Sequence, residues 1–142
     1  MAKLLQRLQD TAKSGVYRAS RVEAIEDALR GSRLSLARIA LQDVTDKVAL
    51  LRRIAARLGL PAWFGENWDA LEDCLTDLSW RAGEGNVLVV EGFQFLPAED
   101  LGVLIDVMIS AAEFWAARGK PFFAVFIDPE RTLALASLYQ EA

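Results

Sequence analysis

The sequence predicts a three-layer α/β/α fold built around a small parallel sheet. Two short continuous apolar runs, VLVVE at 87–91 and FFAVFI at 122–127, are typical of parallel strands that are buried on both faces. Helical patterns alternate with such runs along the chain, as they do in sheets that helices cover on both sides. The 142 residues correspond to one domain that is long enough to bury a core.

The first part of the chain is predicted to contain a helix, a strand and a second helix. Residues 2–13 carry leucines at helical spacing, and GVYR at 15–18 is a candidate for a short strand. The second helix is expected to begin after Ser20, whose side chain would form a capping box with Glu23, and to end at Gly31.

The next strand and helix have clearer boundaries. Apolar residues alternate and then continue through RLSLARIALQDV at 33–44, which favours a strand. The helix that follows is predicted to begin at a Thr45 cap and to stop at Gly59 and Pro61. Five apolar side chains share one face of this helix: Val48, Leu51, Ile54, Ala55 and Leu58.

The second half of the chain is predicted to contain three more helices. The first begins at an Asn67 cap. Its apolar side carries Trp68, Leu71, Cys74, Leu75 and Leu78. Residues 98–118 form a long helix that ends before Pro121, and residues 128–140 begin a last helix.

Missing residue types exclude several classes of function. The chain has no histidine, so it lacks the commonest general base and the commonest transition-metal ligand. Cys74 is the only cysteine, which excludes an intrachain disulfide and a cysteine metal cluster. The sequence also has no Gly-rich phosphate loop. We therefore expect a protein that is not an enzyme and that binds no metal or cofactor.

Neither a signal peptide nor a membrane span is predicted. Charged or polar residues interrupt each apolar run in MAKLLQRLQDTAK, and the apolar segment 101–112 carries Asp106. We therefore expect a cytoplasmic protein that does not bind membranes, and we expect it to be a monomer.

The acidity of the chain is concentrated in one segment. The residues between Arg57 and Arg81 include five acids and no base, so this window carries a formal charge of −5. The remaining chain, with 16 basic and 15 acidic residues, carries +1. The five acids are Glu66, Asp69, Glu72, Asp73 and Asp77. A dense negative patch attracts cationic partners and repels nucleic acid.

Two structural interpretations of these acids compete with a binding site. Charge runs are most often the solvated side of an amphipathic helix. However, solvated helices usually mix charges, as the preceding helix does, and Trp63, Phe64 and Trp80 flank this segment. A divalent-metal site made by the three aspartates would need ligands from other elements, because one helix face spreads the aspartates too far apart.

The segment LPAWFGENWDALEDCLTDL at 60–78 strongly resembles the barstar family, which are intracellular inhibitors of barnase-type and related guanyl-specific ribonucleases. The family motif has Leu-Pro, an aromatic pair, Gly-x-Asn-x-Asp-Ala-Leu and then Asp-Cys-Leu-Thr, and every part of it is present. The order of elements over residues 34–127 is also similar. The resemblance implies a barstar-like domain at 34–142, with residues 1–33 as an N-terminal extension packed on it.

The resemblance also implies how the chain would bind. Asp73 would take the place of a substrate phosphate, Asp69 would pair with a neighbouring basic side chain, and Trp63 would pack against the catalytic histidine of the ribonuclease. Glu72 stands where the family carries an aromatic residue. The implied partner-binding residues are Trp63, Phe64, Gly65, Asn67, Asp69, Glu72, Asp73 and Asp77.

Three hypotheses for the function follow. The leading one is an inhibitor or immunity protein that blocks a basic, barnase-like ribonuclease of the extracellular or toxin type. The second is an acidic protein-binding module without inhibitory activity. The third is a carboxylate-metal hydrolase, which would require acids from other elements close to Asp69 and Asp73.

Overall fold

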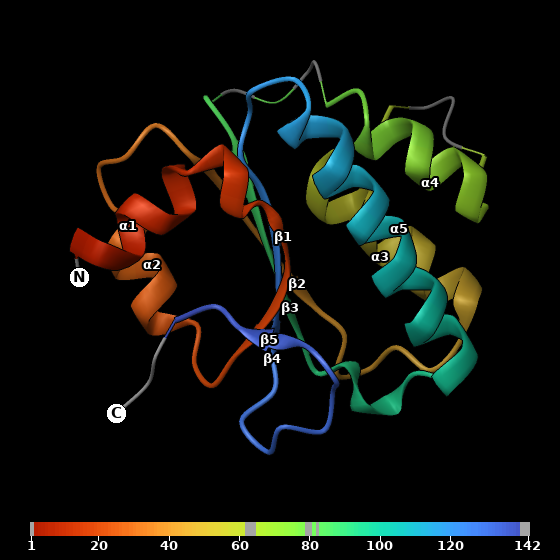
Figure 1. The fold of residues 1–142 in the computed structure, drawn as a ribbon. Helices are drawn as coiled ribbons and strands as arrows, with labels where there is room; N and C mark the ends of the chain where they lie inside the picture. The colour runs from red at the N-terminus through yellow and green to blue at the C-terminus, as the bar shows by residue number, and fades with distance from the viewer. Residues whose placement is uncertain (1, 62–64, 79–80, 82, 140–142) are drawn as a thin grey trace.

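The computed structural model describes residues 2–61, 65–78, 81 and 83–139. Within these residues, one five-stranded sheet lies between two layers of helices (Figure 1). All pairings are parallel, and the strand order is β2-β3-β4-β1-β5. The strands are β1 (Gly15–Ala19), β2 (Ser35–Ala40), β3 (Asn86–Glu91), β4 (Phe122–Ile127) and β5 (Ala136–Ser137). The predicted three-layer α/β/α fold is confirmed.

Helices cover both faces of the sheet. The first two lie on one face, and the other three lie on the opposite face (Figure 1). The helices are α1 (Ala2–Gln9), α2 (Glu23–Leu29), α3 (Lys47–Leu58), α4 (Trp68–Leu75) and α5 (Ala98–Ala116). Two short 3-10 turns, η1 (Thr11–Lys13) and η2 (Phe93–Phe95), follow α1 and β3.

The central strands β3 and β4 supply both hydrophobic cores. In β3, Val87 and Val89 pack in the core under α1 and α2, whereas Leu88 and Val90 pack in the larger core under α3, α4 and α5. All four side chains have no exposed surface. Because both faces of these strands are buried, their sequences are continuous apolar runs and do not alternate with polar residues.

The N-terminal part agrees with the sequence in its elements but not in its capping. The strand predicted at 15–18 is β1, which pairs with both β4 and β5. The residue that caps α2 differs from the predicted Ser20. Val22 is the N-cap residue, and its own side chain makes no capping hydrogen bond. Val22 is buried and has helical backbone angles (φ −78°, ψ −25°), so it lacks the extended geometry that a capping side chain requires.

α3 begins one residue later than predicted. Asp46 is the cap in place of Thr45, because its carboxylate accepts a hydrogen bond from the Ala49 amide at 2.8 Å. Aspartate and threonine are both favourable caps, so propensity does not distinguish these neighbours. The predicted stop is confirmed, since Gly59 adopts the left-handed conformation (φ 65°) that ends α3.

The helix predicted over residues 128–140 is wrong for the described part of that segment. The buried Asp128 carboxylate accepts hydrogen bonds from the backbone amides of Thr132 (3.0 Å) and Leu133 (2.8 Å). The chain then runs beside β1 and pairs with it as β5. These bonds occupy backbone groups that a helix would need for its own hydrogen bonds.

Candidate protein-binding surface

α4 carries the predicted acidic side. Asn67 caps this helix as predicted, because its side-chain oxygen accepts a hydrogen bond from the Ala70 amide at 2.7 Å. The opposite side of the segment also agrees with the prediction. It buries Leu71, Cys74, Leu75 and Leu78, and it places the partly buried Trp68 against the larger core. The apolar spacing therefore identified correctly which side of α4 faces inward.

Neighbouring elements fix the C-terminal end of α4. Trp115 on α5 donates a hydrogen bond from Nε1 to the Leu75 carbonyl at 2.8 Å. The Thr76 hydroxyl donates to the Glu72 carbonyl at 2.9 Å. The Trp115 donor satisfies a carbonyl at the end of the helix, where backbone partners run out. The Thr76 hydroxyl adds to the bond that the Thr76 amide already makes with the Glu72 carbonyl. The end of α4 is therefore held by the scaffold as well as by its own backbone.

Arg81 anchors the chain just after α4. Its guanidinium donates to the Ser35 hydroxyl (2.8 Å), the Asn86 side-chain oxygen (3.2 Å) and the Leu58 carbonyl (3.3 Å). Burial lowers the pKa of Arg81. Arg81 thus joins the chain after α4 to the starts of β2 and β3 and to the end of α3.

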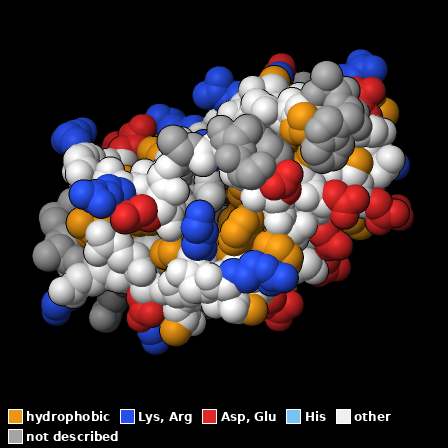
Figure 2. Space-filling model, turned by 90° about the horizontal axis from the view of Figure 1, so that it is seen from above, with side chains coloured by type: hydrophobic (Ala, Val, Ile, Leu, Met, Phe, Trp, Pro, Cys, Tyr) orange, Lys and Arg blue, Asp and Glu red, His pale blue; other side chains and the backbone are white. Residues whose placement is uncertain are grey.

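We call Asp69, Glu72, Asp73 and Asp77 the acidic face. All four side chains are exposed. In Figure 2 one group of Asp and Glu side chains lies at the right-hand end, the side on which α4 lies, and others are scattered over the rest of the face. In the part of the chain that the structure describes, no ion pair involves Asp69, Glu72 or Asp73. Like charges one turn apart destabilise a helix, and among the described residues no cation forms an ion pair with Asp69 or Asp73 to offset this repulsion.

Glu66, the fifth acid of the segment, differs from the others. Its carboxylate binds Arg52 of α3, with 2.6 Å between Arg52 Nε and Glu66 Oε1. The hydrogen bond from Arg52 to Glu66 raises the pKa of Arg52. The segment therefore does receive one basic partner, from a helix that precedes it. Arg52 was not predicted as part of the site, because a separation of 14 residues gives no local signal for this contact.

Six of the eight predicted partner-binding residues lie in the part of the chain that the structure describes. Trp63 and Phe64 lie outside the described residues. The other six occupy α4 and the residues that directly flank it, and among them Gly65 has a packing role: a Cβ there would lie 3.2 Å from Asn67 Nδ2. A side chain at position 65 would therefore crowd the residue that caps α4.

Cys74 is a buried thiol, as predicted. It has no exposed surface, and burial raises its pKa, with Asp73 and Asp77 adding to the effect. A thiol with a raised pKa that reagents cannot reach is a poor nucleophile.

Among the described residues, no group of three or more His, Cys, Asp or Glu residues is placed to hold a metal ion. Nor does any helix in that part of the chain have the length and apolar character needed to cross a membrane.

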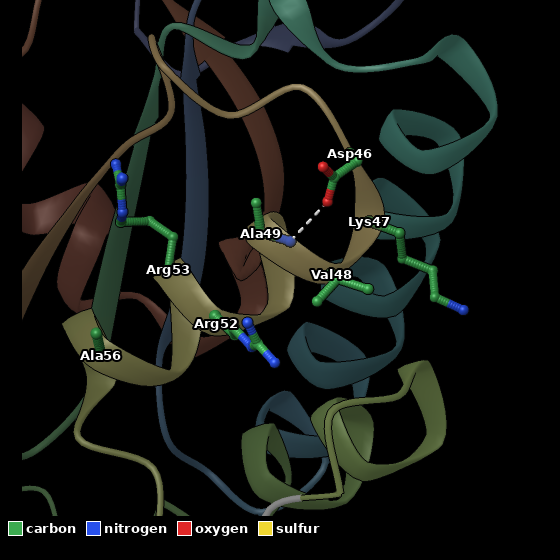
Figure 3. A pocket seen from close by; sticks show the side chains of 7 residues that line it. All are labelled: Asp46, Lys47, Val48, Ala49, Arg52, Arg53 and Ala56. Carbon is green, nitrogen blue, oxygen red and sulfur yellow. Dashed lines mark hydrogen bonds between the residues drawn. The ribbon is translucent and has the colours of Figure 1, made fainter.

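A hollow of about 730 Å³ lies on the exposed side of α3 (Figure 3). Its lining residues are Asp46, Lys47, Val48, Ala49, Arg52, Arg53 and Ala56. Two of its cations already bind carboxylates: Arg53 binds Asp43 at 2.9 Å, and Arg52 binds Glu66. The hollow is therefore poorly suited to bind an anion.

The fold and the surface define a class of protein: an α/β domain that presents exposed carboxylates from one firmly anchored helix. The family model of Barstar (barnase inhibitor) matches residues 34–127. The chain therefore belongs to the Barstar family, and the resemblance seen in the sequence is confirmed. The family is described as an inhibitor of barnase, which is a ribonuclease. Membership of the chain in this family therefore points to a ribonuclease as the kind of protein partner.

Other comparisons add information on the fold alone. No curated protein matches the chain. A solved structure of the Aeropyrum pernix ORC2 protein, in ADPNP-ADP complexes, is similar with a TM-score of 0.56 and 16% sequence identity. The match covers 91% of this chain and 39% of the ORC2 chain. At this identity the similarity concerns the arrangement of helices and strands.

Proposed function

We propose that the chain is an inhibitor of the immunity-protein type, which binds and blocks the cationic active site of a small guanyl-specific ribonuclease. The observation that carries this proposal is the acidic face. Its carboxylates are exposed on a capped and anchored helix, and three of them have no ion pair within the described chain. Membership in the Barstar family supports the same function.

Electrostatics provide the mechanism. A ribonuclease must bind the phosphates of RNA, so its active site presents basic side chains. Carboxylates on a fixed helix can occupy these basic groups without offering a bond to cleave. Because α4 is anchored before it binds, little conformational entropy is lost when the complex forms. Inhibition of this kind is occlusion and requires no catalytic group on the inhibitor.

The proposed contacts follow the residues of the acidic face and the segment before it. Asp73 would replace a phosphate at the centre of the site, Asp69 would bind a neighbouring cation, and Asp77 would lie at the rim. The segment before α4 would contribute the aromatic contact through Trp63. The full set of proposed contacts is Trp63, Phe64, Gly65, Asn67, Asp69, Glu72, Asp73 and Asp77.

We further infer that the chain is not an enzyme, that it acts as a cytoplasmic monomer, and that it binds neither nucleic acid nor membranes. The lack of histidine supports the first inference, and the acidic face supports the exclusion of nucleic acid. The division into an extension at 1–33 and a domain at 34–142 is also a proposal, supported by the start of the family match at residue 34.

The test is a titration of the purified chain against a panel of small basic ribonucleases, with RNA cleavage as the readout. We expect at least one enzyme to lose activity in proportion to the chain added, until the two are equimolar. Asp73→Ala should inhibit far more weakly. Glu130→Gln, which changes an exposed acid in the loop after β4, should inhibit like the wild type. Full activity of every enzyme at saturating inhibitor would contradict the proposal.

A second candidate function is an acidic protein-binding module without inhibitory activity. Glu72 favours it, because the family carries an aromatic residue at this position and the added charge alters the middle of the face. A stable complex with a basic protein whose RNA cleavage continues unchanged would support the module and contradict the inhibitor.

A further inference from the structure

One ion pair connects α3 to the start of α4. Arg52 Nε lies 2.6 Å from Glu66 Oε1, and the two side chains are 67% and 47% exposed. Figure 3 shows that Arg52 and Arg53 leave α3 in different directions. Arg53 binds Asp43, ahead of the helix, at 2.9 Å. Arg52 is therefore the member of this arginine pair that reaches the segment before α4.

Glu66 has an unusual backbone. Its φ is +52°, in the left-handed region that side-chain-bearing residues seldom adopt. The next residue, Asn67, returns to an extended conformation (φ −137°) and caps α4. The turn at Gly65–Asn67 thus sets where α4 starts. The Arg52 contact holds the side chain of the one residue in this turn that has an unfavourable backbone conformation.

The same contact changes the charge that a partner meets. Glu66 is one of five acids between Arg57 and Arg81, and its charge is neutralised by Arg52 of the same chain. Asp69, Glu72 and Asp73 have no such partner among the described residues. The ion pair therefore separates an acid with a structural role from acids that are available for binding.

We propose that Arg52 is a positioning residue for the binding face. By binding Glu66, it holds the left-handed turn from which α4 begins, and it removes one carboxylate from the charge that steers the partner. This inference rests on the proposed function, because its effect on binding requires a cationic protein partner.

An exposed ion pair by itself contributes little to folding stability, and solvent screens it. The effect of Arg52 should therefore be visible in binding kinetics more than in unfolding. Loss of Arg52 should change the association rate constant and the dissociation rate constant for different reasons. Association depends on net charge, whereas dissociation depends on how well the turn and α4 are held in place.

The experiment measures both rate constants against a ribonuclease that the wild-type chain inhibits. Arg52→Gln should associate faster than the wild type, because the face becomes more negative, and should dissociate about two- to fivefold faster, which matches the strength of an exposed ion pair. Glu66→Gln should associate more slowly and dissociate faster. Arg52→Lys should restore the association rate and part of the dissociation rate. The double variant should dissociate no faster than the single ones, because both residues act through one contact.

Arg53→Gln is the control on the same helix, since it removes an ion pair that does not involve α4. Arg53 is 31% exposed and also donates to the Ala40 carbonyl, so this variant loses at least as many contacts as Arg52→Gln. It should associate faster than the wild type, because the chain again loses one positive charge, but it should dissociate at the wild-type rate. An unchanged dissociation rate for Arg52→Gln, or an equal increase for Arg53→Gln, would overturn the proposal.

A second measurement needs no partner. In the free chain, the amides of Ala70 and Leu71 bond to the side chain and the backbone carbonyl of Asn67. Their hydrogen exchange should be faster in Arg52→Gln than in the wild type and unchanged in Arg53→Gln. Equal exchange in all three proteins would overturn the positioning role, whether or not a ribonuclease is inhibited. Faster exchange without inhibition of any ribonuclease would instead show that only the proposed function fails.

Discussion

Asp73 and Asp77 are four residues apart and both exposed, yet they occupy different places on the acidic face. Asp73 lies in the last turn of α4, whereas Asp77 lies beyond its end. Asp→Ala at either position should change the free energy of unfolding by only about 0.5 kcal/mol. Asp73→Ala should cost about 2 kcal/mol or more of binding free energy, the size of hot spots in interfaces that include barnase–barstar itself.

Asp77→Ala should mainly slow association, because a charge at the rim acts on steering more than on the bound state. Inhibition by the two variants at matched concentration gives the comparison. Equal small losses, or a larger loss for Asp77→Ala, would mean that the centre of the binding face lies elsewhere.

Asp128 shows how one buried carboxylate redirects the chain. Burial by itself would raise its pKa, but hydrogen bonds from Thr132 and Leu133 outweigh burial and, together with the charge of Arg18, hold the pKa below its ordinary value. A folded pKa below the unfolded one means that the carboxylate stabilises the fold above the unfolded pKa. This contribution is lost as pH falls through the folded pKa.

Asp128→Asn should therefore lower the free energy of unfolding by about 1–3 kcal/mol at neutral pH, because a buried acceptor is lost. The difference from the wild type should shrink below a pH of about 4, where aspartate in the unfolded chain also becomes protonated. Urea unfolding of both proteins at neutral pH and at low pH tests this. A difference that stays constant across that range would contradict the role of the ionised form.

At the scale of elements, α4 depends on its cap. Asn67→Ala removes the acceptor for the Ala70 amide and should destabilise the protein by about 1 kcal/mol. Asn67→Asp keeps an acceptor at a favourable helix N-terminus and should retain most of the stability. Denaturant midpoints of the three proteins provide the measurement. An alanine variant as stable as the wild type would show that the cap does not hold α4.

Elements whose pattern reflects burial were predictable. β3 and β4 are apolar throughout because both of their faces are covered, and α5 has periodic apolar residues that face the sheet. The end of the chain was not predictable in this way. Residues 128–139 have helix-like spacing, but Asp128 binds the Leu133 amide and β5 pairs with β1, which is more than 100 residues earlier. Partners so distant leave no local pattern.

The candidate site, like the fold, was predictable only where a local pattern in the sequence reflects burial. The spacing of apolar residues placed Asp69, Glu72 and Asp73 on the exposed side of α4, and the asparagine before the helix gave the cap. The Arg52–Glu66 contact was missed, because it joins two elements across a turn that the sequence does not specify. Local periodicity therefore identified the face but not the contact that positions it.

At the scale of the whole molecule, the binding face and the N-terminal elements lie on opposite sides of the sheet. α1 and α2 cover one face, and α3, α4 and α5 cover the other (Figure 1). Arg38 on β2 connects α2 to β3 through ion pairs with Glu26 (3.0 Å) and Glu91 (2.8 Å). The first helices therefore support the sheet without covering the acidic face.

The distribution of charge predicts the kinetics of association. The segment between Arg57 and Arg81 carries a formal charge of −5, and Arg52 neutralises one of its five acids, Glu66. The four acids that remain should steer a basic partner from a distance. Added salt should slow association far more than it changes dissociation, because screening acts mainly on the approach of the two proteins. Stopped-flow measurements over a range of ionic strength test this. An association rate that does not respond to salt would indicate that the acidic face is only a solvated surface.

The central claim is that the acidic face occupies the site where the ribonuclease binds RNA phosphates. It is tested most directly by competition between the chain and guanosine monophosphate for an inhibited ribonuclease. We predict that the apparent Kd of the chain rises in proportion to the nucleotide concentration, because both ligands require the same cationic groups. An apparent Kd that remains constant while the nucleotide saturates the enzyme would contradict the claim.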